Sequence, residues 1–406
     1  MYKLQNCVQH YAWGSISALP EIFGFSNPEQ LPMAEVWMGA HPSASSRIFT
    51  HGEWQSLEAE IATHPFSMLG EATYQTFQQL PFLVKLLAAD QPLSIQVHPS
   101  WHAAQQGFSR ENKAGIPPDD PTRNYRDANH KPEIIYALTP FKALKGFKPF
   151  DEIAQAFQLL NWHHPAVMAF IDNATSDSLQ QLFSTCLRLV EDEKQQVLTR
   201  LLQNIEQQEK PIGQTILMMA KLWPADLGLL MPLFLNIIEL QPGEALYLPA
   251  GTPHTYLQGV GMEVMANSDN ALRAGLTAKH IDIDELVANV QFREEKAEQL
   301  LLAPVISANQ YHYQVPETDF SLSIIAITSA CSMLTQGLPQ LLLCLEGELH
   351  LRTAQQALRL SHGESVFIPA DQGSFMISGK GQIALTTVGS RHAPITITPF
   401  DKFVTE

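Results

Sequence analysis

Short apolar runs separated by turn-forming residues dominate the first 150 residues. The runs at 82–88, 93–97 and 134–138 are punctuated by Pro, Gly and Asn, which is the pattern of short strands joined by loops. The polar segment 109–130 contains three prolines. We expect this segment to be a long loop with a functional role, because long loops in compact domains are usually functional.

The pattern changes after residue 150, where apolar residues recur at helical spacing in the segments 151–160, 178–190 and 193–208. Leu198, Leu201, Leu202 and Ile205 occupy positions i, i+3, i+4 and i+7, the stripe of an amphipathic helix. We therefore predict a helical insertion over residues 151–222, packed on a β-rich body.

An internal repeat follows the predicted insertion. Residues 240–250 align without a gap with residues 360–370, and Gly243 and Gly363 stand 120 positions apart (363 minus 243). Each copy has a Gly-Glu turn, a short apolar strand and a turn containing Pro. Two copies predict two β-sandwich or barrel units of one type. A predicted helical stretch at 282–299 separates them.

Composition and charge limit the classes of partner and the cellular compartment that we expect for this protein. The chain has 406 residues, 45% of them apolar, which is enough for a sizeable core in two to three domains. Its net charge of −16, from 25 basic and 41 acidic residues, argues against nucleic-acid or anionic-membrane partners, which require clustered positive charge. Four cysteines without CxxC spacing indicate a reducing compartment. With no evident secretory signal or bilayer-spanning run, we expect a cytoplasmic protein, and nothing demands an oligomer, so we expect a monomer.

Candidate metal ligands are spread over three segments. Gln96 and His98 are two positions apart, so on a strand their side chains share one face. Glu133 directly precedes an apolar strand. The spacing from Pro249 through Gly251 to His254 brings the chain round a tight turn to a histidine at the start of the next strand.

The spacing around His254 resembles the second motif of cupins, small β-barrels that often hold a metal. Cupins usually carry His-x-His where this chain has Gln96 and His98. Taken alone, His254 could instead be an inert histidine in a turn. Two imidazoles, a carboxylate and an amide oxygen together suit a zinc ion with an open coordination position.

Longer segments resemble the type I mannose-6-phosphate isomerases (phosphomannose isomerases), zinc enzymes of the cupin superfamily. The resemblance covers nearly the whole chain, including a helical insertion and a C-terminal domain. It is carried by residues 11–14, 34–39, 125–133, 254–259 and 263–279.

This resemblance implies a fold that is mainly β with a helical insertion: two cupin-like β-barrel (jelly-roll) domains plus an α-helical domain. We expect the catalytic cupin-like domain at 1–150 and 223–315, the helical domain at 151–222, and a C-terminal cupin-like domain at 316–406. We predict that the C-terminal domain binds no metal, because Ser374 stands where the repeat would place the equivalent of His254.

The resemblance also implies an activity, the interconversion of mannose 6-phosphate and fructose 6-phosphate through a cis-enediol. It implies one Zn²⁺ per chain, held by four side chains, with Arg273 in the active site and Lys131 in the chemistry. Further implied contacts with the small-molecule sugar phosphate come from Lys85, Trp13, Glu263 and Asp269. The metal ligands implied are Gln96, His98, Glu133 and His254.

The roles of the basic groups stay open at this point. Arg273 is suited to stabilising the enediolate and is a poor base, because its guanidinium stays protonated. Lys131 beside a divalent ion is a candidate base, since like-charge repulsion favours its neutral form, and His130 is the second candidate. Local phosphate partners could come from Lys85, Arg126, Lys131, Arg273 or Lys279.

Two other functions share the same residues. His98, Glu133 and His254 also satisfy a 2-His-1-carboxylate iron site, as in a metal-dependent cupin oxygenase. A non-catalytic sugar-binding cupin is the other alternative, because fold alone does not fix function.

Overall fold

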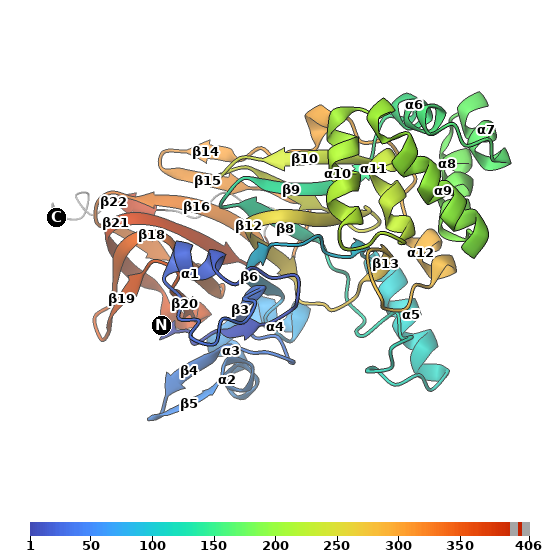
Figure 1. Ribbon diagram of the computed structural model, residues 1–406. Coiled ribbons are helices and arrows are strands. Elements are labelled where there is room, and N and C mark those ends of the chain that lie inside the picture. Colours follow the sequence, from blue (N-terminus) through green and yellow to red (C-terminus); the bar gives the residue numbers. More distant parts are fainter. Residues whose placement is uncertain (390–396, 400–406) are drawn as a thin grey trace. The chain divides into compact units, whose positions relative to one another are not determined.

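The structure is a computed structural model that describes residues 1–389 and the backbone of residues 397–399 (Figure 1). The chain divides into two compact units. The first comprises Met1–Ala88, Val260–Asn267 and Leu302–Glu406, and the second comprises Ala89–Gly259 and Ser268–Leu301. The long strand β12 (His254–Ala266) contributes residues to both units.

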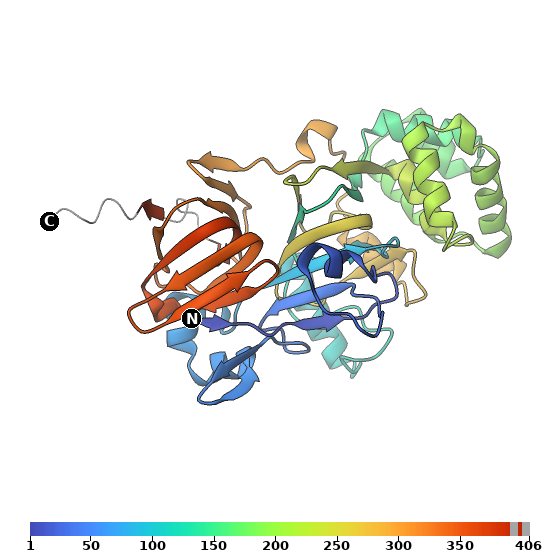
Figure 2. The same ribbon diagram turned by 60° about the vertical axis from the view of Figure 1, so that its left-hand side comes forward.

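The first unit contains a ten-stranded antiparallel sheet built mostly from the C-terminal third of the chain, drawn in orange and red (Figure 2). Its main path runs β1-β20-β18-β21-β16-β15-β14, with β17, β19 and β22 paired at its sides. Buried apolar side chains, including Ile325, Leu342 and Phe375, form its core. The strands are β1 (Tyr2–Lys3), β14 (Val305–Ser307), β15 (Gln310–Tyr313), β16 (Ser321–Ile327), β17 (Cys331–Leu334), β18 (Gln340–Arg352), β19 (Ala357–Ser361), β20 (Ser365–Ile368), β21 (Ser374–Thr387) and β22 (Ile397–Pro399).

The N-terminal part of the first unit adds short strands and helices. Here β3 pairs with both β2 and β6, and β4 and β5 form a separate hairpin. The elements are β2 (Cys7–Gln9), α1 (Ala18–Phe23), β3 (Glu35–Gly39), β4 (Arg47–Thr50), β5 (Glu53–Ser56), α2 (Leu57–Thr63), α3 (Pro65–Leu69), α4 (Glu71–Phe77) and β6 (Phe82–Ala89). The C-terminal part of the unit also contains the 3₁₀ turn η4 (Ala370–Gln372), between β20 and β21.

The second unit is a sheet with a helical insertion. Strand β12 pairs with β9, β7 and β8, and β10, β13 and β11 extend these pairings. The strands are β7 (Ile95–Val97), β8 (Glu133–Ala137), β9 (Phe141–Phe147), β10 (Leu235–Leu240), β11 (Ala245–Leu248) and β13 (Leu272–Gly275). The helices outside the insertion are α5 (Trp101–Lys113), α12 (Ile283–Asn289) and the 3₁₀ turn η3 (Ala297–Gln299).

The inserted helices gather into one bundle, drawn in green (Figures 1 and 2). Aromatic side chains pack between the bundle and the sheet. Phe183 of α8 packs edge-on against Phe147 at the end of β9, with 5.6 Å between the ring centroids, and against Phe234 at the same distance. The helices are α6 (Phe150–Leu160), α7 (Pro165–Asp172), α8 (Ser176–Leu187), α9 (Glu191–Gln203), η1 (Ile205–Gln207), α10 (Lys210–Ala220), η2 (Leu227–Leu230) and α11 (Met231–Phe234).

The sequence repeat is also a structural repeat. Glu244 accepts a hydrogen bond from the backbone N–H of Gln241 at 2.8 Å, and Glu364 accepts one from Ser361 at the same distance. Both turns need the left-handed backbone that glycine favours, with φ of 94° at Gly243 and 80° at Gly363. Each turn leads into a short buried strand, β11 in one copy and β20 in the other.

The predicted fold class, mainly β with a helical insertion, is confirmed. Two local predictions need correction. Residues 109–113 are the last turn of α5 rather than loop. The expected helical stretch at 282–299 contains only α12 and the 3₁₀ turn η3, because residues 290–296 leave the helix as extended chain with one isolated bridge, from Glu294 to Phe147.

Lys148 is a buried cation just after β9. Its Nζ donates a hydrogen bond to the carbonyl oxygen of Pro232 at 2.9 Å. Burial lowers the pKa of Lys148 from 10.5 to about 8, although the charges of Glu209 and Glu152 partly oppose this shift. The folded chain therefore releases this proton at a lower pH than the unfolded chain does.

This difference predicts a pH-dependent stability. Between pH 8 and 10.5 the free energy of unfolding should rise for the wild type relative to Lys148→Met, since only the unfolded wild type still binds the proton there. The rise should approach about 3 kcal/mol, at about 1.4 kcal/mol per pKa unit. Urea unfolding of both proteins across this range measures it. A difference between them that stays constant with pH would contradict the assignment.

Candidate active site

Three ligand-type side chains converge inside the second unit. His98 directly follows β7, Glu133 is the first residue of β8, and His254 is the first residue of β12. The two carboxylate oxygens of Glu133 lie 3.4 Å from His98 Nε2 and 3.5 Å from His254 Nε2. All three residues are buried, and their ligating atoms lie within 4.8 Å of one another. The structure therefore brings three of the four predicted metal ligands together.

The outer nitrogen of each imidazole is held by a backbone carbonyl. His98 Nδ1 lies 2.7 Å from the oxygen of Asn270, and His254 Nδ1 lies 2.9 Å from that of Thr252. Because a carbonyl oxygen only accepts, each Nδ1 carries the hydrogen and each Nε2 of the neutral ring presents a lone pair. This is the arrangement that orients histidines for metal binding.

His98 Nε2 is buried and, among the described residues, has no hydrogen-bond partner. It faces a carboxylate oxygen of Glu133, and two electron-rich atoms at this distance repel each other unless a cation lies between them. The donor set therefore fits a divalent metal ion.

The protonation states of these side chains also favour metal binding. Burial, followed by the charge of Lys131, lowers the pKa of His98 to about 4. Burial alone would raise the pKa of Glu133, but the charge of Lys131 brings it well below its usual value. At neutral pH His98 is therefore neutral and Glu133 ionised, which are the states that bind a metal.

Gln96 and Arg273 lie on the same face of the sheet as His254. In the antiparallel register Gln96 of β7 stands opposite His254 on one side and opposite Arg273 of β13 on the other. Residues directly opposite each other in an antiparallel pair project to the same side. The amide nitrogen of Gln96 donates to Ser94 Oγ at 3.0 Å, which leaves its oxygen as the ligand-type atom.

Positive charges gather in two places near these strands. Lys131 Nζ lies 3.0 Å from a carboxylate oxygen of Glu133. Burial, then the charge of Arg126, lowers the pKa of Arg273, and burial, then the charges of Arg273 and Arg126, lowers the pKa of Lys279. Arg126, Arg273 and Lys279 thus form a cationic cluster, and within the described residues no ion pair joins any of the three to a carboxylate.

Asn270 connects the loop before β8 to a histidine of the site. Its fully buried side chain accepts from the N–H of Arg126 at 2.7 Å and donates to the carbonyl oxygens of Asp127 and Asn129 at 2.9 and 2.8 Å. Its own carbonyl oxygen is the partner of His98. Sequence reasoning gave Asn270 no role, and its only signal was a polar residue inside a long family-like segment.

Replacing the Asn270 side chain should weaken zinc binding, although Asn270 is not itself a proposed metal ligand. In Asn270→Ala the backbone carbonyl remains but loses the bonds that fix its position. We expect zinc affinity to fall by about 10- to 100-fold, the usual effect of losing an outer partner of a ligand. Competition titration with a chromophoric chelator measures it. Asn124→Ala is the matched control, because Asn124 lies in the loop before β8 that Asn270 contacts, but its side chain bonds to Asp282. Equal zinc affinities in the two variants would contradict this role.

The loop that carries Arg126 and Lys131 is anchored by Tyr125. The Tyr125 ring is fully buried against Gly107 of α5, where an added Cβ would lie 2.2 Å from the ring. Glu111 accepts hydrogen bonds from the N–H groups of Asn124 and Tyr125 at 3.0 and 2.9 Å. The predicted functional loop is therefore held in place by its own buried side chains.

The four predicted sugar contacts have different surroundings. In the first unit Lys85 Nζ lies 3.2 Å from Glu263, 3.7 Å from Glu35 and 4.9 Å from the centre of the Trp37 ring. Trp13 is half-buried and stacks on Tyr11 at 5.8 Å. In the second unit Asp269 is exposed, and its N–H donates to Asp127 at 2.8 Å.

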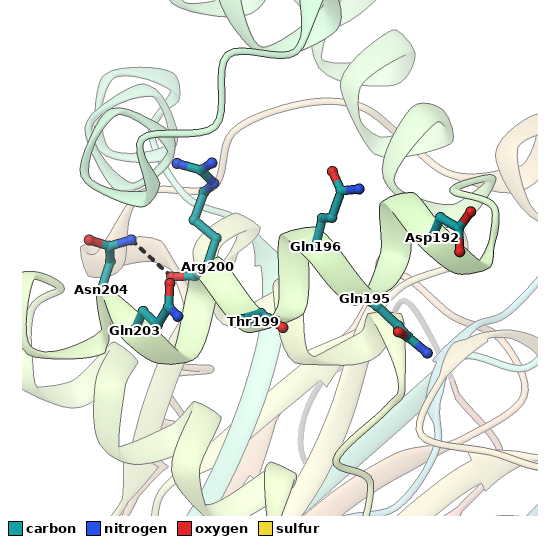
Figure 3. Close-up of a pocket in the computed structure, with 7 residues that line it drawn as sticks. All are labelled: Asp192, Gln195, Gln196, Thr199, Arg200, Gln203 and Asn204. Atoms are coloured by element: carbon teal, nitrogen blue, oxygen red, sulfur yellow. Dashed lines mark hydrogen bonds between the residues drawn. The ribbon is translucent and has the colours of Figure 1, made fainter.

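One further hollow lies on the surface of the helical insertion. It has a volume of about 560 Å³ and is lined only by polar residues of α9 and its C-cap (Figure 3). Asn204 donates there to the backbone oxygen of Arg200 at 2.9 Å. It contains no predicted site residue.

Among the described helices, none has the length and apolar run needed to cross a bilayer.

Known proteins match this chain along its length. Family models match residues 1–150 (phosphomannose isomerase type I, catalytic domain), 151–235 (the helical insertion domain of the same family) and 309–388 (mannose-6-phosphate isomerase, cupin domain). The mannose-6-phosphate isomerase of Salmonella typhimurium is 48% identical over 95% of this chain and 98% of its own. The human enzyme is 32% identical, over 92% and 94%. A crystal structure of a zinc-bound mannose 6-phosphate isomerase superposes with a TM-score of 0.92 at 47% identity, covering 96% of this chain and 99% of that one.

Proposed function

We propose that this chain, which belongs to the type I phosphomannose isomerase family, is a zinc-dependent enzyme that interconverts mannose 6-phosphate and fructose 6-phosphate. The observation that carries the proposal is the buried group of His98, Glu133 and His254, whose ligand atoms lie within 4.8 Å of one another. This group lies on the same sheet as Arg273 and beside Lys131.

Gln96, His98, Glu133 and His254 are the residues that we propose hold one Zn²⁺ per chain. When bound, the ion supplies a positive charge that polarises the sugar carbonyl and orients its hydroxyls. Thr252 and Asn270 keep both imidazoles in the ligating tautomer through their carbonyl oxygens. With no cysteine thiolate in the set, the chemistry suits a catalytic site better than a structural one.

The reaction moves a proton between C2 and C1 through a cis-enediol, and its barrier lies in the weak acidity of a C–H next to a carbonyl. Arg273 is the group that we assign to the negative charge that develops on the oxygen. Lys131 is the group that we assign to the proton, because its Nζ stands 3.0 Å from the ligand Glu133 and a guanidinium does not give up its proton. His130 remains the second candidate.

The cationic cluster of Arg126, Arg273 and Lys279 supports binding of the substrate phosphate. A dianion brought there offsets the mutual repulsion of the three cations and meets planar guanidinium donors that match its oxygens. Lys85, by contrast, is already paired with Glu35 and Glu263. For Lys85, Glu263, Trp13 and Asp269 we retain the proposal of contacts to the sugar.

The remaining expectations stay proposals. They are the catalytic cupin-like domain at 1–150 and 223–315, the helical domain at 151–222, the metal-free C-terminal domain at 316–406, a monomer and a cytoplasmic location. Ser374 begins β21 just as His254 begins β12, which supports the absence of a metal ligand from the C-terminal copy.

A coupled assay for fructose 6-phosphate formation tests the function. The purified enzyme should convert mannose 6-phosphate, lose activity after treatment with a chelator, and regain it with zinc. Iron in the purified protein together with oxygen consumption would favour the cupin oxygenase alternative. Sugar binding without turnover in the zinc-loaded protein would favour the non-catalytic one.

A further inference from the structure

We propose that His51, Glu60 and His64 form a second site for a divalent transition metal of the zinc type, on the surface of the first unit. Their ligating atoms, two imidazole nitrogens and one carboxylate oxygen, all lie within 4.8 Å of one another. The proposal is independent of the isomerase activity, because it involves none of the residues assigned to catalysis.

The backbone holds these three residues in place. His51 and Gly52 are the two turn residues between β4 and β5, and both have left-handed backbone, with φ of 53° and 86°. Positive φ at both positions is typical of a tight hairpin turn, and histidine is among the residues that tolerate it. Glu60 and His64 are four residues apart on α2 and at its C-cap, a spacing that puts both on one side of a helix.

The carboxylate at the base of this group is buried and accepts a hydrogen bond from a neutral side chain. Glu60 is 5% exposed. One of its oxygens accepts from Gln55 Nε2 at 2.6 Å, while the other has His64 Nε2 at 4.0 Å. In the described part of the chain no lysine or arginine is ion-paired with Glu60. A buried carboxylate charge favours a nearby cation, and a metal ion between the two imidazoles would supply it.

The exposure of the two histidines makes the geometry attainable. Both are exposed, so their rings can rotate toward Glu60 with little loss of packing. A tetrahedral zinc with ligand distances of about 2.0–2.2 Å needs donor atoms about 3.3 Å apart, so the present spacing must shorten by roughly 1 Å or more. Water can fill the fourth position on the open side. Imidazole and carboxylate ligands suit zinc, with copper and nickel as competitors.

The proposal is tested by measuring whether the enzyme, with one zinc ion already at the buried site, binds a second zinc ion. Equilibrium dialysis against Zn²⁺ followed by metal analysis should find a second equivalent in the wild type. His51→Asn removes the imidazole and keeps a residue that accepts left-handed backbone, and His64→Gln removes the other. Each should weaken the second equivalent by at least about tenfold, since even outer partners of ligands contribute that much. His163→Asn, at an exposed histidine of the helical insertion, should bind like the wild type.

Several outcomes would overturn the site. These are a single zinc equivalent in the wild type, or a second equivalent that binds as tightly in His51→Asn and His64→Gln as it does in the wild type. The variants should keep full isomerase activity, which also shows that they fold. His254→Ala separates the two proposals, because it should lose the first equivalent and keep the second. Loss of both in that variant would place the second ion at the buried site instead.

Discussion

His254→Ala should abolish zinc binding at the buried site and lower kcat/KM by at least about a thousandfold. Its Nε2 lies 3.5 Å from a carboxylate oxygen of Glu133 in the buried group of candidate ligands. A bound metal stabilises several kcal/mol of developing charge in reactions of this kind. About 4 kcal/mol corresponds to a thousandfold in rate. Metal analysis and the coupled assay on the same preparation measure both effects.

The neighbouring residue provides the control for this loss. Thr255 is next on β12, so its side chain points to the other face of the strand, where its hydroxyl donates to the carbonyl oxygen of Leu93 at 2.8 Å. Thr255→Ala should keep both zinc and activity. A His254→Ala protein that retains one tightly bound zinc and near-normal kcat would contradict the assignment of this residue.

Arg273→Ala should lower kcat by about 10²- to 10³-fold while leaving the zinc content unchanged. Arg273 stands opposite Gln96 in the strand register, yet it is a cation and cannot bind the metal itself. Its proposed role is to stabilise negative charge in the transition state, and removing one such donor typically has an effect of this size. Arg273→Lys should recover only part of the rate, because an ammonium lacks the planar guanidinium fork.

Zinc content separates this role from a structural one. A variant that loses activity together with its metal would indicate that Arg273 supports the fold of the site rather than the reaction. Arg352→Ala, at an exposed arginine at the end of β18, is the control for loss of a positive charge as such. If Arg273→Ala raised only KM, Arg273 would serve the phosphate and not the reacting carbons.

Much of the metal site followed from local rules. Alternation along a strand predicted that Gln96 and His98 share a face, and the Pro249–Gly251 turn predicted that His254 begins a strand, as it does at the start of β12. Glu133 likewise begins β8. These rules involve only a few residues each, so they hold before the tertiary structure is known.

The supporting shell could not be predicted in this way. Asn270 bonds to backbone groups of residues 126, 127 and 129, more than 140 positions earlier in the chain. Nothing near Asn270 in the sequence signals those partners, because they depend on how the loop before β8 meets the segment before β13. Where charged residues pair also depends on tertiary packing, as with Lys85 and Glu263.

Helix boundaries show the same limit on a smaller scale. The apolar stripe predicted a helix at 193–208, but α9 ends at Gln203 and a 3₁₀ turn follows at Ile205–Gln207. The stripe continues through Ile205 because that residue still packs against the core, although the backbone has left the α-helix. Two helices, α7 and α10, were not predicted separately, although each has proline in its first turn, a known start signal.

The most direct test of the account is a crystal structure of the zinc-loaded enzyme, with the ion located by anomalous scattering. We expect a strong peak at the buried site, about 2.0–2.2 Å from the Nε2 atoms of His98 and His254 and from a carboxylate oxygen of Glu133, with the amide oxygen of Gln96 completing the set. No strong peak at this buried point, or an ion bound without both histidines, would contradict the account.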